Sequence, residues 1–146
     1  MTVVAWDGKT LAADKQNTNA GFAGTVTKIY RVPGGIVGFT GNEGHAMALL
    51  SWFEGGRDPE KWPKKGGETC ASAIFATSDG LFIYSGEDGP HAARNQSKFD
   101  AWGCGYAYAL AAMHLGHDAR SAVEVACALD VNCGMGIDAM TLESSQ

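Results

Sequence analysis

The chain has 146 residues, of which 45% are hydrophobic and 18% are charged. This length fits one compact domain, so we expect a single domain over residues 1–146. The hydrophobic content excludes an intrinsically disordered chain, and the net charge of -5 argues against a nucleic-acid-binding protein. No apolar run approaches the length of a membrane span and no signal-peptide core is present, so we expect no membrane partner and a cytoplasmic location.

Strands are expected at the start of the chain. A β-branched run is followed by Asp7-Gly8, which is a strong signal for a two-residue hairpin loop. Pro33-Gly34-Gly35 marks a second turn. The expected strands cover residues 2–6, 9–14, 24–32 and 36–40.

The remainder of the chain mixes helices with strands. Asn42 and Asp118 are the expected N-caps of two helices, and a further helix is expected after Gly105. Gly55 and Gly116 are expected to end the first and second of these three helices. An exposed loop is expected over residues 57–68, and strands over residues 71–76, 81–84, 99–103 and 136–142.

This order of elements predicts the fold class. Strands, one helix, more strands and then two helices form an α+β protein rather than an alternating βαβ one. Residues 11–13 and 73–76 are apolar on both faces of their expected strands, so both faces need cover. We therefore expect a four-layer α-β-β-α sandwich, in which two stacked, mainly antiparallel sheets are flanked by helices.

The chain has four cysteines, which we expect to be reduced thiols in the cytoplasm: Cys70, Cys104, Cys127 and Cys133. They form no Cys-x-x-Cys pair and the histidines have no zinc-binding spacing, so the sequence predicts no metal site. Gly103-Cys104-Gly105 precedes a helix, but Tyr108 stands where a dinucleotide-binding motif needs its third glycine. We therefore expect no cofactor.

The second residue, Thr2, is a candidate nucleophile. Initiator Met1 is usually removed when the next residue is this small, which would leave Thr2 with a free α-amine. A hydroxyl nucleophile and its general base would then belong to one residue. The α-amine has a reference pKa of about 7.7–8.0, so part of it is neutral at cellular pH and can accept a proton. Many cytosolic proteins begin Met-Thr, so this signal is weak by itself.

The expected hairpin brings an acid close to Thr2. A loop at Asp7-Gly8 would pair Trp6 with Lys9 and place Thr2 beside Ala13 and Asp14, with the Asp14 side chain on the opposite face of the sheet from Thr2. Side-chain contact would then need help from another strand. Lys28 is the available partner for a buried Asp14, and a lysine there would lower the pKa of the Thr2 hydroxyl. The alternatives are a purely structural ion pair or two exposed charges.

Five short motifs in order along the chain carry a family resemblance. Residues 2–14 (Thr-Val-Val-Ala-Trp-Asp-Gly-Lys-Thr-Leu-Ala-Ala-Asp) resemble the start of mature proteasome β-subunits and of the bacterial peptidase subunit HslV. Residues 25–29 resemble their Thr-Val-Lys-Lys-Val stretch, and residues 38–41 resemble Gly-Phe-Ala-Gly. Residues 103–105 resemble Gly-Ser-Gly, and residues 130–134 resemble Asp-x-x-Ser/Thr-Gly. The chain is most similar to short proteasome-like N-terminal nucleophile hydrolases of phage and prophage.

The resemblance implies a role for each matching position. Thr2 would be the nucleophile, Asp14 and Lys28 would set its electrostatics, and the Gly41 N–H would donate to the oxyanion. Asp130 and Cys133 would hold the N-terminus in position. Cys104 and Cys133 stand where the family usually has hydroxyls, and a thiol is the poorer hydrogen-bond partner.

The favoured function is an N-terminal threonine hydrolase, a peptidase that works on peptide or protein substrates inside a homo-oligomeric ring. The alternative is a proteasome-fold protein that does not cleave and serves as a structural or assembly part, for instance of a phage particle. A hydrolase of non-peptide amides is a third reading. The sequence identifies no ATPase or virion partner, and a phage-encoded protein would work in the host cytoplasm.

The resemblance also implies surfaces for ring assembly. The helices after Asn42 and Gly105 are expected to pack between subunits. His45, Met47 and Tyr108 are expected to face outward from them, where their bulk would mark an interface. The alternative is that these residues complete the core of the monomer.

Overall fold

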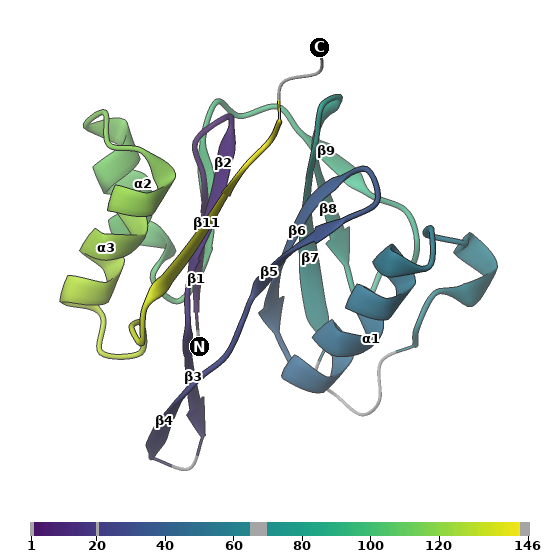
Figure 1. Ribbon diagram of the computed structural model, residues 1–146, viewed down its shortest axis with the longest axis horizontal. Helices are drawn as coiled ribbons and strands as arrows, with labels where there is room; N and C mark the ends of the chain where they lie inside the picture. Colours follow the sequence, from purple (N-terminus) through teal and green to yellow (C-terminus); the bar gives the residue numbers. More distant parts are fainter. Residues whose placement is uncertain (1, 20, 65–69, 144–146) are drawn as a thin grey trace.

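The structure, a computed structural model, describes residues 2–19, 21–64 and 70–143. Two β-sheets lie face to face, with two helices outside one sheet and one helix outside the other (Figure 1). This arrangement confirms the α+β class and the predicted four layers. None of the helices in the described residues is long and apolar enough to cross a membrane.

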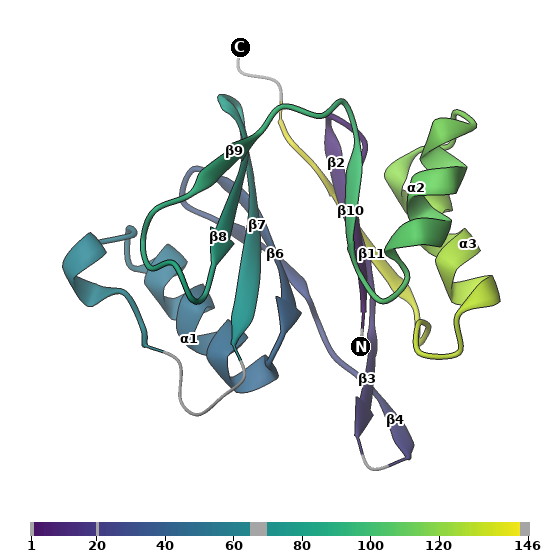
Figure 2. The same ribbon diagram turned by 180° about the vertical axis from the view of Figure 1, so that it is seen from behind.

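The first sheet carries the N-terminus at the end of a central strand. It is antiparallel throughout and has four strands in the order β10 (Asp100–Gly103), β1 (Val3–Trp6), β2 (Thr10–Asp14) and β11 (Ile137–Thr141). Side chains alternate across the sheet. Val3, Ala5 and Ala12 pack beneath α2 (Tyr106–His114) and α3 (Ala119–Leu129), whereas Val4 and Leu11 face the second sheet. Figure 2 shows the two helices covering the outer face of this sheet.

The second sheet has five strands in the order β5 (Ile29–Val32), β6 (Gly35–Gly41), β7 (Ala71–Thr77), β8 (Gly80–Ser85) and β9 (Ala93–Asn95). The helix α1 (Glu43–Glu54) covers its outer face, and the 3₁₀ turn η1 (Pro59–Lys61) follows it. Phe53 lies at the centre of this layer, with ring contacts to Trp52, Phe75 and Tyr84. The layer therefore buries its aromatic side chains between helix and sheet.

Local sequence signals set the helix boundaries. The Asn42 side chain accepts the His45 N–H and caps α1, and the Asp118 side chain accepts the Ser121 N–H and caps α3. Both caps satisfy N–H groups that have no partner within the helix. The expected loop over residues 57–68 contains η1, and its residues 65–68 lie outside the described part of the chain.

The predicted strand over residues 24–32 is wrong. It is divided into β4 (Phe22–Thr25) and β5, which belong to different sheets, and β4 pairs with β3 (Gln16–Asn19). The resulting hairpin projects from one end of the molecule (Figure 1), and the side chains of β4 are exposed. The expected strand is interrupted because residues 26–28 connect this hairpin to the second sheet.

The predicted hairpin register is also wrong, by two residues. The turn is centred on Gly8-Lys9, so Trp6 pairs with Leu11 rather than with Lys9. The Asp7 carboxylate causes this shift, because it accepts the N–H groups of Lys9 and Thr10 and makes Asp7 the first residue of the turn. Continuing this register places Asp14 opposite Val3.

The predicted outward position of His45 is wrong, whereas Met47 and Tyr108 are exposed as expected. The His45 ring is buried, and its Nδ1 accepts the N–H of Ala71 at 2.9 Å. His45 therefore ties α1 to the first residue of β7 and does not contribute to an outer surface.

Candidate active site

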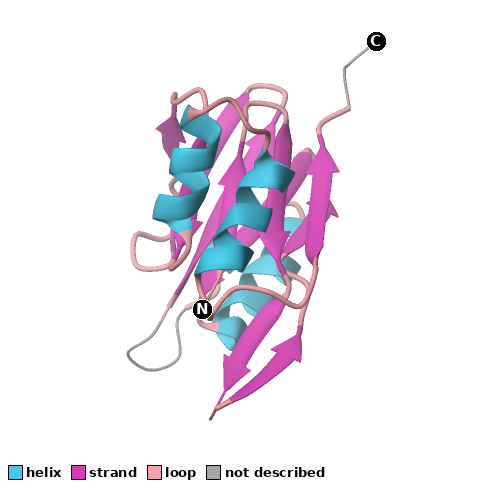
Figure 3. Ribbon diagram, turned by 90° about the vertical axis from the view of Figure 1, so that its left-hand side faces the viewer, coloured by secondary structure: helices cyan, strands magenta, loops and turns pink. Residues whose placement is uncertain are grey.

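Thr2 lies at the end of the first sheet, immediately before β1, and only 6% of it is exposed. Its carbonyl oxygen accepts the Gly105 N–H at 3.2 Å and the Cys104 S–H at 3.3 Å. The loop between β10 and α2 therefore holds the backbone of Thr2 in place. Figure 3 shows the N-terminus at the end of the molecule from which the β3–β4 hairpin projects.

Asp14 is completely buried and accepts hydrogen bonds from five groups. Its Oδ1 accepts the Thr2 hydroxyl at 2.9 Å, the Val3 N–H at 3.1 Å and the Lys28 ammonium at 2.7 Å. Its Oδ2 accepts the N–H groups of Gln16 at 3.3 Å and Gly134 at 3.1 Å. Burying a carboxylate is costly without such partners, and these five hydrogen bonds provide them beside the Thr2 hydroxyl.

Lys28 reaches Asp14 from the segment that connects the two sheets. Its side chain is only 10% exposed, and its carbonyl accepts the Phe39 N–H from β6. The other nearby lysine, Lys15, pairs with Asp138 at 2.7 Å on a more exposed surface. The structure therefore brings Thr2, Asp14 and Lys28 into contact. Lys28 belongs to the segment between β4 and β5, which the sequence pattern predicts to be part of one continuous strand.

A small pocket of about 60 Å³ opens beside Thr2. Lys28 and Gly41 line it, together with Gln16, Asn17, Val26, Thr27, Phe39, Thr40, Glu43, Ala46 and Met47. Gly41 has a φ of +101°, and a Cβ there would lie 2.5 Å from the carbonyl oxygen of Cys70. Both the backbone conformation and the space around it therefore require glycine at this end of β6.

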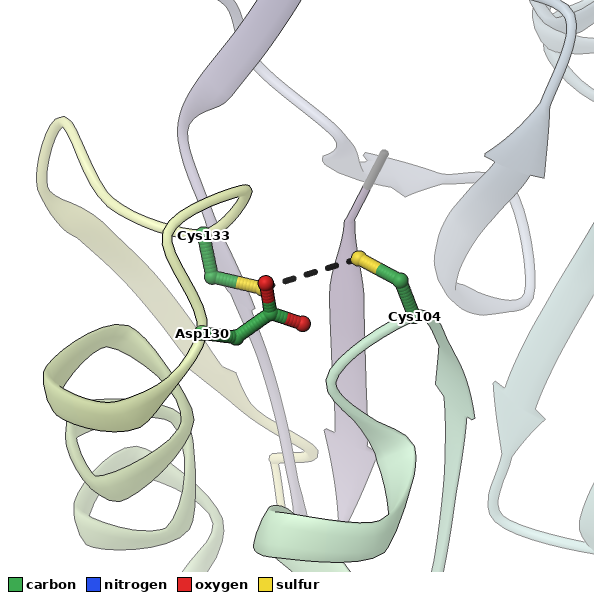
Figure 4. A group of neighbouring side chains, drawn as sticks. All are labelled: Cys104, Asp130 and Cys133. Carbon is green, nitrogen blue, oxygen red and sulfur yellow. Dashed lines mark hydrogen bonds between the residues drawn. The ribbon is translucent and has the colours of Figure 1, made fainter.

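The side chains of Cys104, Asp130 and Cys133 come together in a second cluster (Figure 4), and Cys104 contacts the Thr2 carbonyl oxygen. The two sulfur atoms lie 3.9 Å apart, and both thiols are free. Burial raises the pKa of the Cys133 thiol, and the negative charge of Asp14 raises it further, so Cys133 is protonated at neutral pH. The Cys104 thiol contacts the Thr2 carbonyl oxygen directly. Cys133 donates its N–H to the Asp130 carbonyl, and the next residue, Gly134, donates its N–H to Asp14, which binds Thr2.

Several contributors to the site were not identified from the sequence. Gln16 and Gly134 hold Asp14 through their backbone N–H groups, which carry no side-chain signal. Gly103 has a φ of +95°, and a Cβ there would lie 2.3 Å from the Thr2 carbonyl oxygen. The Gly-x-Gly pattern around Cys104 is the local signal that could have indicated this close approach.

No protein-family model and no curated protein matches the chain. Solved structures do match it along its whole length. BPH from Thiobacillus denitrificans, determined in complex with epoxomicin, is 21% identical, with a TM-score of 0.72 over 99% of this chain and 100% of that one. HslV from Trypanosoma brucei is 19% identical, with a TM-score of 0.67 over 98% of this chain and 99% of that one. The chain therefore has a proteasome-like fold.

Proposed function

We propose that this protein is an N-terminal threonine peptidase whose nucleophile is the Thr2 hydroxyl after removal of Met1. The observation that carries the proposal is the contact of Thr2 Oγ1 with Asp14, which also binds Lys28, at the edge of a pocket. A nucleophile, a charged group that tunes it and a space for substrate are thus found together. The resemblance to proteasome β-subunits and HslV supports the same assignment.

The reaction would begin with proton transfer within Thr2. The free α-amine takes the hydroxyl proton, and Oγ1 attacks the carbonyl carbon of the scissile amide. The amine then gives this proton to the leaving nitrogen as the carbon–nitrogen bond breaks. Water hydrolyses the resulting ester and regenerates Thr2. A retained Met1 would convert the amine into an amide, which cannot serve as the base.

Lys28 and Gly41 would stabilise the charges that develop. The Lys28 ammonium lies in the same cluster as the Thr2 hydroxyl, and its positive charge favours the deprotonated form of that hydroxyl. Its positive charge also disfavours protonation of the α-amine, which keeps that amine available as the base. The Gly41 N–H would donate to the tetrahedral oxyanion at the edge of the pocket.

The pocket indicates what kind of residue would precede the cleaved bond. Val26, Ala46 and Met47 give it an apolar wall, and Glu43 adds a carboxylate at its edge. Asn17 donates to the Glu43 carboxylate at 2.9 Å, which orients it. We expect a preference for apolar side chains, because Val26, Ala46 and Met47 form this wall.

A homo-oligomeric ring in the cytoplasm is the form in which we expect the peptidase to work. Met47 on α1 and Tyr106 and Tyr108 on α2 expose apolar surface from the outer layers. Surfaces of this kind commonly pack against another subunit. A closed ring would confine the cleavage sites and keep other proteins away from them.

The test combines intact mass with covalent labelling. We expect the mass of the purified protein to lack Met1, and we expect epoxomicin, the ligand in the BPH structure, to add one molecule per chain. Thr2→Ala should take up no epoxomicin and retain less than about one per cent of the turnover of a fluorogenic peptide library. Thr2→Ser is the matched control, because it keeps both the hydroxyl and the amine and should retain label and turnover.

Other outcomes would contradict the proposal. Turnover by Thr2→Ala above that level would exclude Thr2 as the nucleophile. A retained Met1, without label or turnover in the wild type, would instead favour the alternative of a structural or assembly protein that does not cleave.

A further inference from the structure

The proposed mechanism leaves the thiols of Cys104 and Cys133 without a chemical role. They stand where the resembling proteins have hydroxyls, and a thiol is a weaker hydrogen-bond donor. Figure 4 shows the two side chains pointing toward each other from separate loops, with the Asp130 carboxylate beside them. One ligand atom from each of the three residues lies within 4.8 Å of the others.

The spacing of the sulfur atoms fits a metal ion better than a disulfide. Two thiolates on one tetrahedral Zn²⁺, with Zn–S bonds of about 2.3 Å, lie about 3.8 Å apart. The observed Sγ–Sγ distance is 3.9 Å. A disulfide would need these atoms at about 2.05 Å, so the observed separation is that of two unbonded sulfur atoms.

We propose that Cys104, Cys133 and Asp130 form a binding site for Zn²⁺ or a similarly thiophilic divalent cation, with an open coordination position on the side of Thr2. Thiolate ligands select soft cations, and three protein ligands leave one position for water or another donor. On that side the Thr2 carbonyl oxygen lies 3.3 Å from the Cys104 sulfur.

The surrounding structure holds the three ligands together. The Asp130 carbonyl accepts the Cys133 N–H, and its carboxylate accepts the Asn132 N–H, which fixes the loop that carries two of the ligands. A Cβ at Gly105 would lie 3.0 Å from the Cys133 sulfur, so glycine there lets the sulfur approach the loop of Cys104.

Binding would affect the neighbouring Thr2. Each thiol loses its proton to solvent as its sulfur–metal bond forms, so Cys104 could no longer donate to the Thr2 carbonyl. The cation would also stand beside the nucleophile. We therefore expect Zn²⁺ to inhibit turnover, and this consequence, unlike the binding itself, depends on the proposed function.

The binding test uses the full chain, stripped with a chelator and kept reduced with a phosphine. Zn²⁺ is titrated by calorimetry, and Co²⁺ by absorbance for the thiolate-to-cobalt charge-transfer band. We expect one ion per chain, and a Kd raised at least about tenfold by Cys104→Ser, Cys133→Ser or Asp130→Asn. Cys127→Ser is the matched control, because it removes a thiol outside the cluster and should leave the Kd unchanged.

The outcomes separate this inference from the proposed function. Zn²⁺ binding weaker than about 0.1 mM, or equal binding by wild type and the two cluster serine variants, would overturn the metal site. Absence of the charge-transfer band would do the same. Binding by a protein that takes up no epoxomicin would support the metal site and contradict the peptidase, and the reverse pattern would contradict the metal site alone.

Discussion

The Thr2 hydroxyl donates to the Asp14 carboxylate at 2.9 Å, although Asp14 lies opposite Val3 in the β1–β2 hairpin. A regular pleat would keep Thr2 and Asp14 on opposite faces of the sheet. Thr2 precedes the first residue of β1 and Asp14 is the last residue of β2, so both lie where the ladder ends. The Asp14 carboxylate can therefore meet the Thr2 hydroxyl, the Val3 N–H and Lys28 together.

Lys28→Ala should destabilise the fold because it leaves the buried Asp14 charge without its cation. We expect a loss of about 3–5 kcal/mol in the free energy of unfolding, measured by urea denaturation, together with a strong loss of turnover. The control is Lys15→Ala, because its pair with Asp138 is 21% and 31% exposed and should contribute at most about 1 kcal/mol. Equal losses from the two variants would contradict the account. A double-mutant cycle with Asp14→Asn should show coupling between Asp14 and Lys28.

Gly103→Ala should displace Thr2. The new Cβ would lie 2.3 Å from the Thr2 carbonyl oxygen, and the backbone there has a φ of +95°. Gly116→Ala separates these two effects, because Gly116 has a φ of +98° with nothing within 4 Å of an added Cβ. Both variants should lose about 1 kcal/mol or more of stability from backbone strain, but only Gly103→Ala should lose epoxomicin labelling as well. Full labelling of Gly103→Ala would show that the position of Thr2 does not depend on this glycine.

Cys127 should make the stability depend on alkaline pH. Burial raises the pKa of this thiol from 9.0 to about 11, and the charge of Asp14 adds to the effect. As the pH rises, the unfolded chain loses this proton first, so the contribution is complete below pH 9 and is lost between pH 9 and about 11. Urea denaturation of wild type and Cys127→Ser across this range isolates the thiol. Parallel curves for the two proteins would show that Cys127 is not protonated preferentially in the folded state.

Assembly should depend on the exposed aromatic side chains of α2. Tyr106 and Tyr108 are 51% and 40% exposed, and a ring would bury them between subunits. Light scattering at micromolar concentration should give a closed species of about six or more subunits, and Tyr108→Glu should shift it to smaller species. A wild-type monomer of 15.3 kDa would exclude the ring. It would also remove the argument for a confined peptidase.

Much of the local structure was predictable because its causes lie within a few residues. Asn42 and Asp118 cap their helices through N–H groups three residues ahead, and the two apolar faces of residues 11–13 require a covered sheet. The candidate pair of Thr2 and Asp14 followed from their nearness across one short hairpin, even though the predicted register was wrong. Each of these inferences depends on sequence neighbours alone.

Tertiary structure alone decided how the site is completed. The crossing of residues 26–28 between sheets brings Lys28 to Asp14, and the loop after α3 brings the Gly134 N–H to the same carboxylate from 120 residues away. The grouping of Cys104 with Asp130 and Cys133, and the burial of His45 against β7, likewise depend on how separate layers pack. Such contacts join segments that are far apart in the sequence, and the hydrophobic periodicity of each segment does not indicate which other segment it will contact. They form because a buried charge or polar group must find its partner in the packed core.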